Sequence, residues 1–276
     1  MPTFVAPGVA VLEPEEAALF DALETRFQGI AAALGARQVA GPALLPEEDL
    51  ARLDFFRNFP HLGLPVATLT DRARGELARG EVSTPSPEHP LASTGCYLPT
   101  ATCYGLLVSL KERAFETPEV ITSVGRCFRN EDHYDGLRRL RAFHMREALY
   151  VGSQEGVVDH LSRATELVLG LADLLGIKVR REPATDPFYL GDGSRALLNQ
   201  LDPVKFEFVS DDGTAIASVN RHRNFFGERL GIRFADESAY SGCLAFGVER
   251  WVHALLQVHG DPQRALIATK RQLRKV

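Results

Sequence analysis

A short polar turn between two strand-like segments is the feature that most limits how this chain can fold. Residues 204–210 and 214–220 have the character of strands, and Asp211-Asp212-Gly213 lies between them. An Asp-Gly pair between two such segments is a strong hairpin signal, because glycine readily adopts the backbone angles of a tight turn. The two segments therefore predict an antiparallel pair, and with it a sheet whose neighbouring strands run in opposite directions.

Three further segments have the spacing of amphipathic helices: residues 14–34, 154–175 and 247–258. In the first, the apolar residues recur every three or four positions, which places them on one stripe. They are Leu19, Leu23, Phe27, Ile30 and Leu34. Gly35 follows the last of them and is a plausible helix stop.

A second strand pair is predicted at 124–131 and 142–151, with its turn around Asp135-Gly136, and a short strand runs from Ala36 to Pro42. Helices that alternate with hairpins predict an α+β fold with a mainly antiparallel sheet. We expect one domain over residues 1–276. Residues 66–100 are rich in Thr, Ser, Pro and Gly and predict a mobile surface excursion from it.

Composition excludes several classes of protein. The chain has 276 residues, 45% of them hydrophobic, which is enough for a sizeable core without disulfides. It contains no apolar run of about 18 residues and no secretory signal pattern, so we expect a cytoplasmic protein that does not enter membranes. The four cysteines are then reduced, and burial as small hydrophobes is their simplest interpretation. The formal net charge of −5 argues against a general nucleic-acid binder.

One predicted strand carries charges that are unusual in a half-buried sheet. Arg129 and Glu131 are two residues apart, so both side chains lie on one face, together with Cys127. Across the hairpin, Phe143 and Glu147 share a face by the same count. An arginine, an aromatic ring and a carboxylate together can hold a phosphate, stack on a base and accept from an adenine amino group. The alternative is a surface ion pair on a two-sided sheet.

A second charged group lies at the start of the last predicted helix. Gly247 opens this helix, and Arg250 lies in its first turn. A helix N-terminus and a guanidinium group together attract phosphate. The alternative is an ordinary solvated arginine.

Taken together, these segments resemble class II aminoacyl-tRNA synthetases. Phe128-Arg-Asn-Glu131 followed by Phe143 is similar to motif 2 of that class, and Gly247-Val-Glu-Arg250 is similar to motif 3. The first helix leading to Gly41-Pro42 resembles motif 1, the dimer element, and the three motifs occur in the right order. Within the class, the chain resembles the seryl-tRNA synthetase core and especially the amino acid:[carrier protein] ligases. This resemblance rests on residues 98–104, 143–147, 186–188, 205–207, 217–222 and 242–243.

The resemblance implies a zinc site and an ATP site. The zinc ligands would be Cys103, Glu147 and Cys243, with Cys96 as the competitor for the first position. ATP contacts are implied at Arg129, Glu131, Phe143, Glu207, Ser218 and Arg250. Amino-acid contacts are implied at Cys103, Glu147, Asn220 and Cys243. Arg129 would bind the α-phosphate and Arg250 the γ-phosphate, and Phe143 and Arg250 would sandwich the adenine that Glu131 recognises.

The chain departs from the seryl enzymes at one position. They carry a glutamate that helps to hold magnesium three residues before the serine of this segment, and here Ala215 precedes Ser218 at that distance. Glu207 is the substitute candidate for binding Mg²⁺.

The implied activity is ATP-dependent activation of a small amino acid, glycine or alanine, and its transfer to the phosphopantetheine thiol of a carrier protein. The implied assembly is a homodimer through residues 35–45. We expect no tRNA substrate, because no basic domain precedes the first helix. Arg138, Arg139 and Arg141 would steer an acidic carrier. Two alternatives remain open: a non-catalytic synthetase-like regulator that binds an amino acid, and a stand-alone aminoacyl-tRNA synthetase paralogue.

Overall fold

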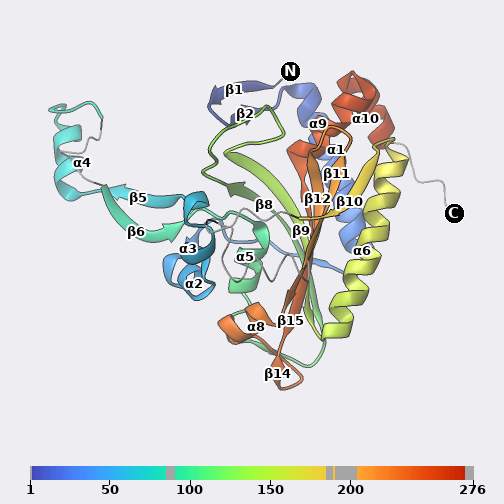
Figure 1. Cartoon of the computed structure of the whole chain (residues 1–276). Coiled ribbons are helices and arrows are strands. Elements are labelled where there is room, and N and C mark those ends of the chain that lie inside the picture. The colour runs from blue at the N-terminus through green and yellow to red at the C-terminus, as the bar shows by residue number, and fades with distance from the viewer. Residues whose placement is uncertain (1, 85–90, 185–188, 190–203, 271–276) are drawn as a thin grey trace.

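The computed structural model describes residues 2–84, 91–184, 189 and 204–270, and it centres on a seven-stranded sheet (Figure 1). The strand order is β10-β11-β12-β15-β9-β8-β3. All neighbouring pairs are antiparallel except β3 and β8, which confirms the predicted α+β fold with a mainly antiparallel sheet. In sheet order the strands span Val179–Pro183, Lys205–Ser210, Ala215–Arg223, Tyr240–Gly247, Ala142–Gly152, Glu119–Phe128 and Arg37–Gln38.

Four helices cover one face of this sheet: α1 (Pro14–Ala33), α6 (Gln154–Leu174), α9 (Val248–His259) and α10 (Pro262–Lys270) (Figure 1). The predicted stripe of α1 is buried against the sheet, and Phe27 stacks on Phe246 of β15 with ring centroids 4.1 Å apart. The helix ends where expected, because Gly35 follows it with φ +80°. This layer forms the larger core and supports the sheet from behind.

The other face of the sheet carries smaller elements that leave room for a site. They are α2 (Glu47–Arg52), α3 (Phe55–Asn58), α5 (Thr102–Val108) and α8 (Phe225–Leu230). Helix α5 packs on β8 and β9, and its buried Leu106 and Leu107 join a second core with Leu149 and Val151 of β9. This packing fixes the start of α5 over the middle of the sheet.

The predicted surface excursion contains regular structure. Strands β5 (Pro65–Leu69) and β6 (Leu91–Tyr97) pair antiparallel, and β4 (Leu45–Pro46) joins β6 in a three-stranded sheet. Between β5 and β6 lies α4 (Asp71–Ala78), whose first turn is capped by the Thr70 side chain. Figure 1 shows this arm projecting away from the central sheet. The loop-like composition was misleading because β5 and β6 are largely exposed strands, so they lack the regular alternation of apolar and polar residues that marks a half-buried strand.

Several boundaries and elements differ from the prediction. The strand expected at 36–42 is limited to β3, and β8 ends at Phe128 rather than at residue 131. Helix α10 was not predicted, and neither was the N-terminal hairpin. The central strand β15, the edge strand β10 and the helices α2, α3, α5 and α8 were not predicted either. The N-terminal hairpin and the remaining short elements are β1 (Thr3–Ala6), β2 (Val9–Val11), η1 (Pro60–Leu62), β7 (Ala114–Phe115), β13 (Arg233–Phe234) and β14 (Glu237–Ser238). None of the described helices is long and apolar enough to cross a membrane.

Candidate active site

A cavity of about 500 Å³ opens on the face of the sheet that carries α5 and α8. Its walls come from β9, β11, β12 and β15, from the start of α5 and α9, and from the segment after β8. All of the site residues predicted above line this cavity. They are Cys103, Arg129, Glu131, Phe143, Glu147, Glu207, Ser218, Asn220, Cys243 and Arg250.

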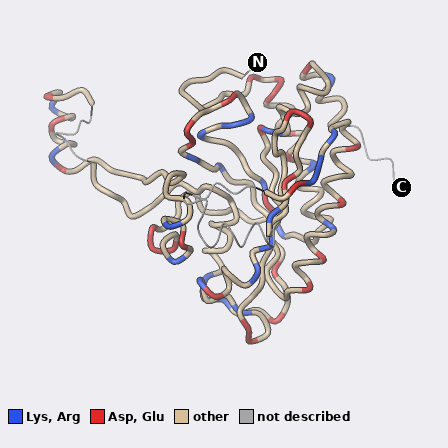
Figure 2. Tube along the Cα trace, in the orientation of Figure 1, with Lys and Arg blue, Asp and Glu red and all other residues tan. Residues whose placement is uncertain are grey.

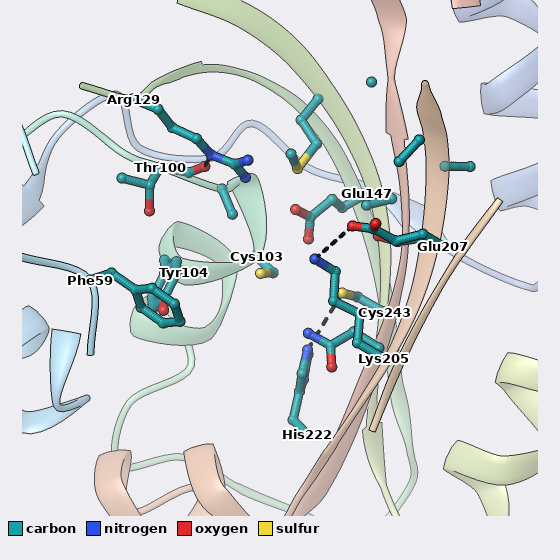
Figure 3. Close-up of a pocket in the computed structure, with 18 of the residues that line it drawn as sticks. Phe59, Thr100, Cys103, Tyr104, Arg129, Glu147, Lys205, Glu207, His222 and Cys243 are labelled. Carbon is teal, nitrogen blue, oxygen red and sulfur yellow. Dashed lines mark hydrogen bonds and ion pairs between the residues drawn. The ribbon is translucent and has the colours of Figure 1, made fainter. Parts of the chain in front are cut away.

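Arg129 is held over an aromatic ring at one end of the cavity. Its guanidinium carbon lies 5.1 Å from the ring centroid of Phe143, and its Nε donates a 3.1 Å hydrogen bond to the carbonyl of Thr100 (Figure 3). A cation over a ring face is stabilised electrostatically, and the carbonyl fixes the direction of the guanidinium plane. The remaining donors of Arg129 are therefore positioned for an anion in the cavity.

The structure corrects the expected strand face around Arg129. Cys127 is fully buried and is not among the residues that line the cavity, and burial raises the pKa of its thiol to about 12. Because β8 ends at Phe128, Arg129 and Glu131 lie beyond the strand, where strict alternation no longer applies. Glu131 still reaches the cavity, and its carboxylate forms a 2.8 Å ion pair with Arg139.

Arg250 reaches the same cavity from the first turn of α9, as predicted. Its Nε donates to the carbonyl of Arg138 at 2.8 Å, and another nitrogen donates to the carbonyl of Ala215 at 2.9 Å. Burial, together with the charge of Arg129, lowers the pKa of Arg250 to about 10, so the guanidinium stays charged at neutral pH. Two arginines close enough to repel each other favour a polyanion between them.

Glu207 and Ser218 lie directly opposite each other on β11 and β12. The Glu207 carboxylate forms a 3.1 Å ion pair with Lys205, whose ammonium group points into the cavity (Figure 3). Ala215, where the seryl enzymes carry glutamate, contributes its backbone carbonyl to Arg250 instead.

Cys103, Glu147 and Cys243 converge from three elements at the other end of the cavity. Figure 3 shows Cys103 at the start of α5, Glu147 on β9 and Cys243 on β15, directed toward a common region. The Cys243 thiol, burial and the nearby Glu147 raise the pKa of Cys103. Burial raises the pKa of Glu147 despite the opposing effect of the Cys103 thiol, and its Oε2 atom is buried with no hydrogen-bond partner among the described residues.

This donor set fits a zinc ion. Zn²⁺ prefers thiolate sulfur, imidazole nitrogen and carboxylate oxygen, and a bound cation would lower the raised pKa values and satisfy the orphaned Glu147 oxygen.

One member of the cluster was not predicted as a ligand. The ligand atoms of Cys103, His222 and Cys243 all lie within 4.8 Å of one another, and the His222 Nε2 atom lies 3.5 Å from the Cys243 sulfur. Burial lowers the pKa of His222 to about 3, so its ring is neutral. The spacing Asn220-Arg-His222 on a strand was the signal that could have revealed it, because residues two apart share a face.

The other sequence candidates lie outside the cluster. Cys96 is on β6 of the projecting arm, opposite Pro46 and Val66. The segment Asp186-Pro-Phe188 lies outside the described residues. The three arginines expected to steer a carrier are engaged within the chain, because Arg138 contacts Asp135, Arg139 contacts Glu131 and Arg141 contacts Tyr134.

The sequence of the site agrees with a known family model. The model for the tRNA synthetase class II core domain (G, H, P, S and T) matches residues 96–259. This chain belongs to the class II tRNA synthetase core family. The match includes Cys103, Glu147 and Cys243, and it includes Arg129 and Arg250 as well.

Curated relatives narrow the comparison within the class II family. Two proteins of Bradyrhizobium diazoefficiens are named amino acid--[acyl-carrier-protein] ligases 1 and 2. The first is 35% identical over 156 residues, which cover 53% of this chain and 47% of the relative. The second is 30% identical over 237 residues, which cover 79% of this chain and 69% of that relative. The match thus spans about half the length of the first relative.

Solved class II structures share the fold. The M. kandleri SerRS in complex with A. aeolicus tRNASec superposes with a TM-score of 0.82 at 20% sequence identity, covering 99% of this chain and 60% of that one. The seryl-tRNA synthetase from Pyrococcus horikoshii complexed with ATP superposes with a TM-score of 0.69 at 16% sequence identity, covering 97% of this chain and 58% of that one. At these identities the likeness establishes the architecture alone.

Proposed function

We propose that this class II chain activates a small amino acid with ATP as an aminoacyl-adenylate and transfers it to the phosphopantetheine thiol of a carrier protein. The observation that carries the proposal is the meeting of two groups in one cavity. Arg129, Phe143 and Arg250 form one end, and the cluster of Cys103, Glu147 and Cys243 forms the other. A nucleotide and an amino group bound there would face each other across the cavity.

The arginine end of the cavity suits ATP. Arg129 would hold the α-phosphate and Arg250 the γ-phosphate, while Phe143 stacks on the adenine and Glu131 accepts from its amino group. Attack of a carboxylate on the α-phosphorus needs no nucleophile from the protein, so positioning and charge stabilisation do the work. Glu207 and Ser218, adjacent on β11 and β12, lie where a magnesium ion on the phosphates could be held.

The thiol end of the cavity suits the amino group. Zinc held by Cys103, Glu147 and Cys243 would supply a Lewis-acidic position for a neutral amine. Recognition of the amino group says nothing about the side chain, so the surrounding volume must select the substrate. The ammonium of Lys205, paired with Glu207, projects into this part of the cavity and favours glycine or alanine over larger residues.

Two observations support a carrier protein rather than tRNA as the acceptor. The Bradyrhizobium relatives are named for acyl-carrier-protein ligation. Basic and acidic residues are interspersed along the described chain (Figure 2), and the net charge of −5 gives no overall positive field for a nucleic acid.

Amino-acid-dependent exchange of pyrophosphate into ATP, run over all twenty amino acids, tests the activation step. We expect exchange with glycine or alanine and little with larger side chains. Exchange with none of the twenty would favour the regulator alternative instead.

We also propose that the protein is a homodimer through residues 35–45, as motif 1 implies. Such an interface is isologous. Light scattering at micromolar concentration should give twice the 30.4 kDa chain mass. A stable monomer would contradict this assembly.

A further inference from the structure

The turn between β11 and β12 joins two other segments of the chain through the carboxylate of Asp212. The Oδ1 atom accepts hydrogen bonds from the Ser210 hydroxyl at 2.8 Å and from the backbone N–H of Thr214 at 3.1 Å. The Oδ2 atom lies 2.7 Å from Nε2 of His253 on α9 and 3.6 Å from Nε of Arg138, in the segment after β8. Asp212 is not among the residues that line the cavity. One carboxylate outside the cavity therefore holds together three segments that help to form it.

The side chain of Arg138 is bound to the same turn. Its Nε donates to the Thr214 hydroxyl at 2.9 Å, and one terminal nitrogen donates to the backbone carbonyl of Asp212 at 3.1 Å. The other terminal nitrogen donates to the carboxylate of Asp135 at 3.2 Å. A planar guanidinium group with a partner at each of its three nitrogens has a fixed position and plane. The charge of Arg138 thus anchors its own segment to the turn between β11 and β12.

The backbone of this anchored segment holds Arg250. The carbonyl of Arg138 accepts from Nε of Arg250 at 2.8 Å, and the carbonyl of Ala215 accepts from a second nitrogen at 2.9 Å. Ala215 is the first residue of β12 and follows directly after the turn. On α9, His253 is three residues after Arg250, so the two lie on one side of the helix. The contacts of Asp212 therefore reach both acceptors of Arg250 and the helix that carries it.

The charges around Arg250 show why it needs such an anchor. The nearby charge of Arg129 is one cause of the lowered pKa of Arg250, which means that the two guanidinium groups repel each other. Without fixed acceptors, this repulsion would turn Arg250 away from Arg129. Although burial opposes the effect, hydrogen bonds from His253 and from the turn lower the pKa of Asp212. The Asp212 carboxylate is therefore ionised at neutral pH, and hydrogen bonds to an ionised acceptor are the stronger kind.

We propose that Asp212 is a positioning residue for the polyphosphate of ATP, because it holds Arg138 in place and the Arg138 carbonyl orients Arg250. The proposal rests on the assignment of Arg250 to the γ-phosphate in the proposed function. Asp212 does not line the cavity, so its effect reaches the nucleotide through Arg250. Loss of the Asp212 charge should therefore weaken the binding of a triphosphate and leave the binding of a monophosphate unchanged.

Calorimetric titration of the full chain with ATP and with AMP, both with Mg²⁺ and without amino acid, tests the proposal. Asp212→Asn keeps an oxygen for the hydrogen bonds of the turn and removes the charge. We expect it to weaken ATP binding about 10-fold, in the range for loss of a hydrogen bond to a charged group, with unchanged AMP binding. Thr214→Val, which removes the acceptor of Arg138 Nε, should have a smaller effect in the same direction. Asp211→Asn is the matched control in the same turn, because Asp211 is 69% exposed and lies 3.9 Å from Arg180.

The same titrations in an Arg250→Ala background test whether the effect passes through Arg250. If it does, Asp212→Asn should add little to the loss of ATP affinity that Arg250→Ala causes alone. An undiminished further loss in that background would overturn the proposal, and so would equal losses of ATP and AMP affinity. Wild-type ATP binding that Asp212→Asn leaves unchanged would overturn the proposal alone. A wild-type protein that binds no ATP would overturn the proposed function together with it.

Discussion

The carboxylate of Glu249 binds both the backbone and the ring of His144. The backbone N–H of His144 donates to the two Glu249 oxygens at 2.8 and 3.0 Å, and the ring Nδ1 lies 2.7 Å from one of them. His144 follows Phe143 on β9, and Glu249 precedes Arg250 on α9. These contacts tie the strand that carries Phe143 to the helix that carries Arg250.

We therefore expect His144→Ala to disturb ATP binding although His144 is not among the residues that line the cavity. The substitution removes the ring contact and leaves Glu249 with the backbone N–H of residue 144 alone, and small displacements of positioning groups are costly to catalysis. The ATP concentration for half-maximal pyrophosphate exchange should rise about 10-fold, with most of the rate recovered at saturating ATP. His259→Ala is the control, since His259 contacts the Leu175 carbonyl at the far end of α9. Equal effects of the two substitutions would contradict this link.

Arg129→Ala should lower the exchange rate by about 10²–10³-fold, the typical cost of removing one donor from a developing charge. Arg181→Ala is a matched control, because Arg181 lies 3.9 Å from the ring centroid of Phe206 and is not among the residues that line the cavity. Near-normal exchange by Arg129→Ala would reject the motif 2 assignment.

Cys103→Ala should abolish stoichiometric zinc binding, whereas Cys96→Ala should retain it. The reason is position: Cys103 lies with His222 and Cys243, and Cys96 lies on the projecting arm. Elemental analysis after gel filtration should give about one zinc per chain for the wild type and for Cys96→Ala. The opposite pattern would make Cys96 the ligand.

We expect the buried His160 side chain to make the folded protein less stable in acid. Burial lowers its pKa to about 4 from the ordinary value of 6.5, against the weaker effect of a 3.4 Å contact with the Ala148 carbonyl. Below pH 6.5 the unfolded chain therefore takes up a proton that the folded chain does not. This residue should reduce the free energy of unfolding by about 3 kcal/mol as the pH falls to 4.

Urea denaturation in the presence of EDTA between pH 7 and pH 4 measures this effect. His160→Gln, which keeps a donor for the Ala148 carbonyl, should lose less stability over that interval than the wild type. Parallel pH profiles of the two proteins would contradict the expected role of His160.

Periodicity and turn chemistry predicted the parts of the fold that local sequence determines. The apolar stripe of α1 and the Asp-Gly turn between β11 and β12 are local features, and both were predicted to within a few residues. The projecting arm was predicted only as a surface excursion without regular structure, because β5 and β6 are exposed strands with no apolar alternation to reveal them.

The same distinction applies to the site. Arg129, Glu147 and Arg250 belong to motifs that the sequence shows directly, and the structure brings them into one cavity. His222 was missed as a neighbour of the thiols although it lies two residues from Asn220, because its approach to Cys243 depends on how β12 pairs with β15. The contact between His144 and Glu249 spans 105 residues and depends on how α9 packs on β9.

Transfer of labelled glycine or alanine to an acceptor tests the central claim most directly. The protein is incubated with ATP, the labelled amino acid and either total tRNA or a holo carrier protein from the same genome. We predict label on the carrier through a thioester to its phosphopantetheine arm, none on tRNA, and none on the apo carrier. Label on tRNA, or carrier labelling that persists without the phosphopantetheine arm, would contradict the account.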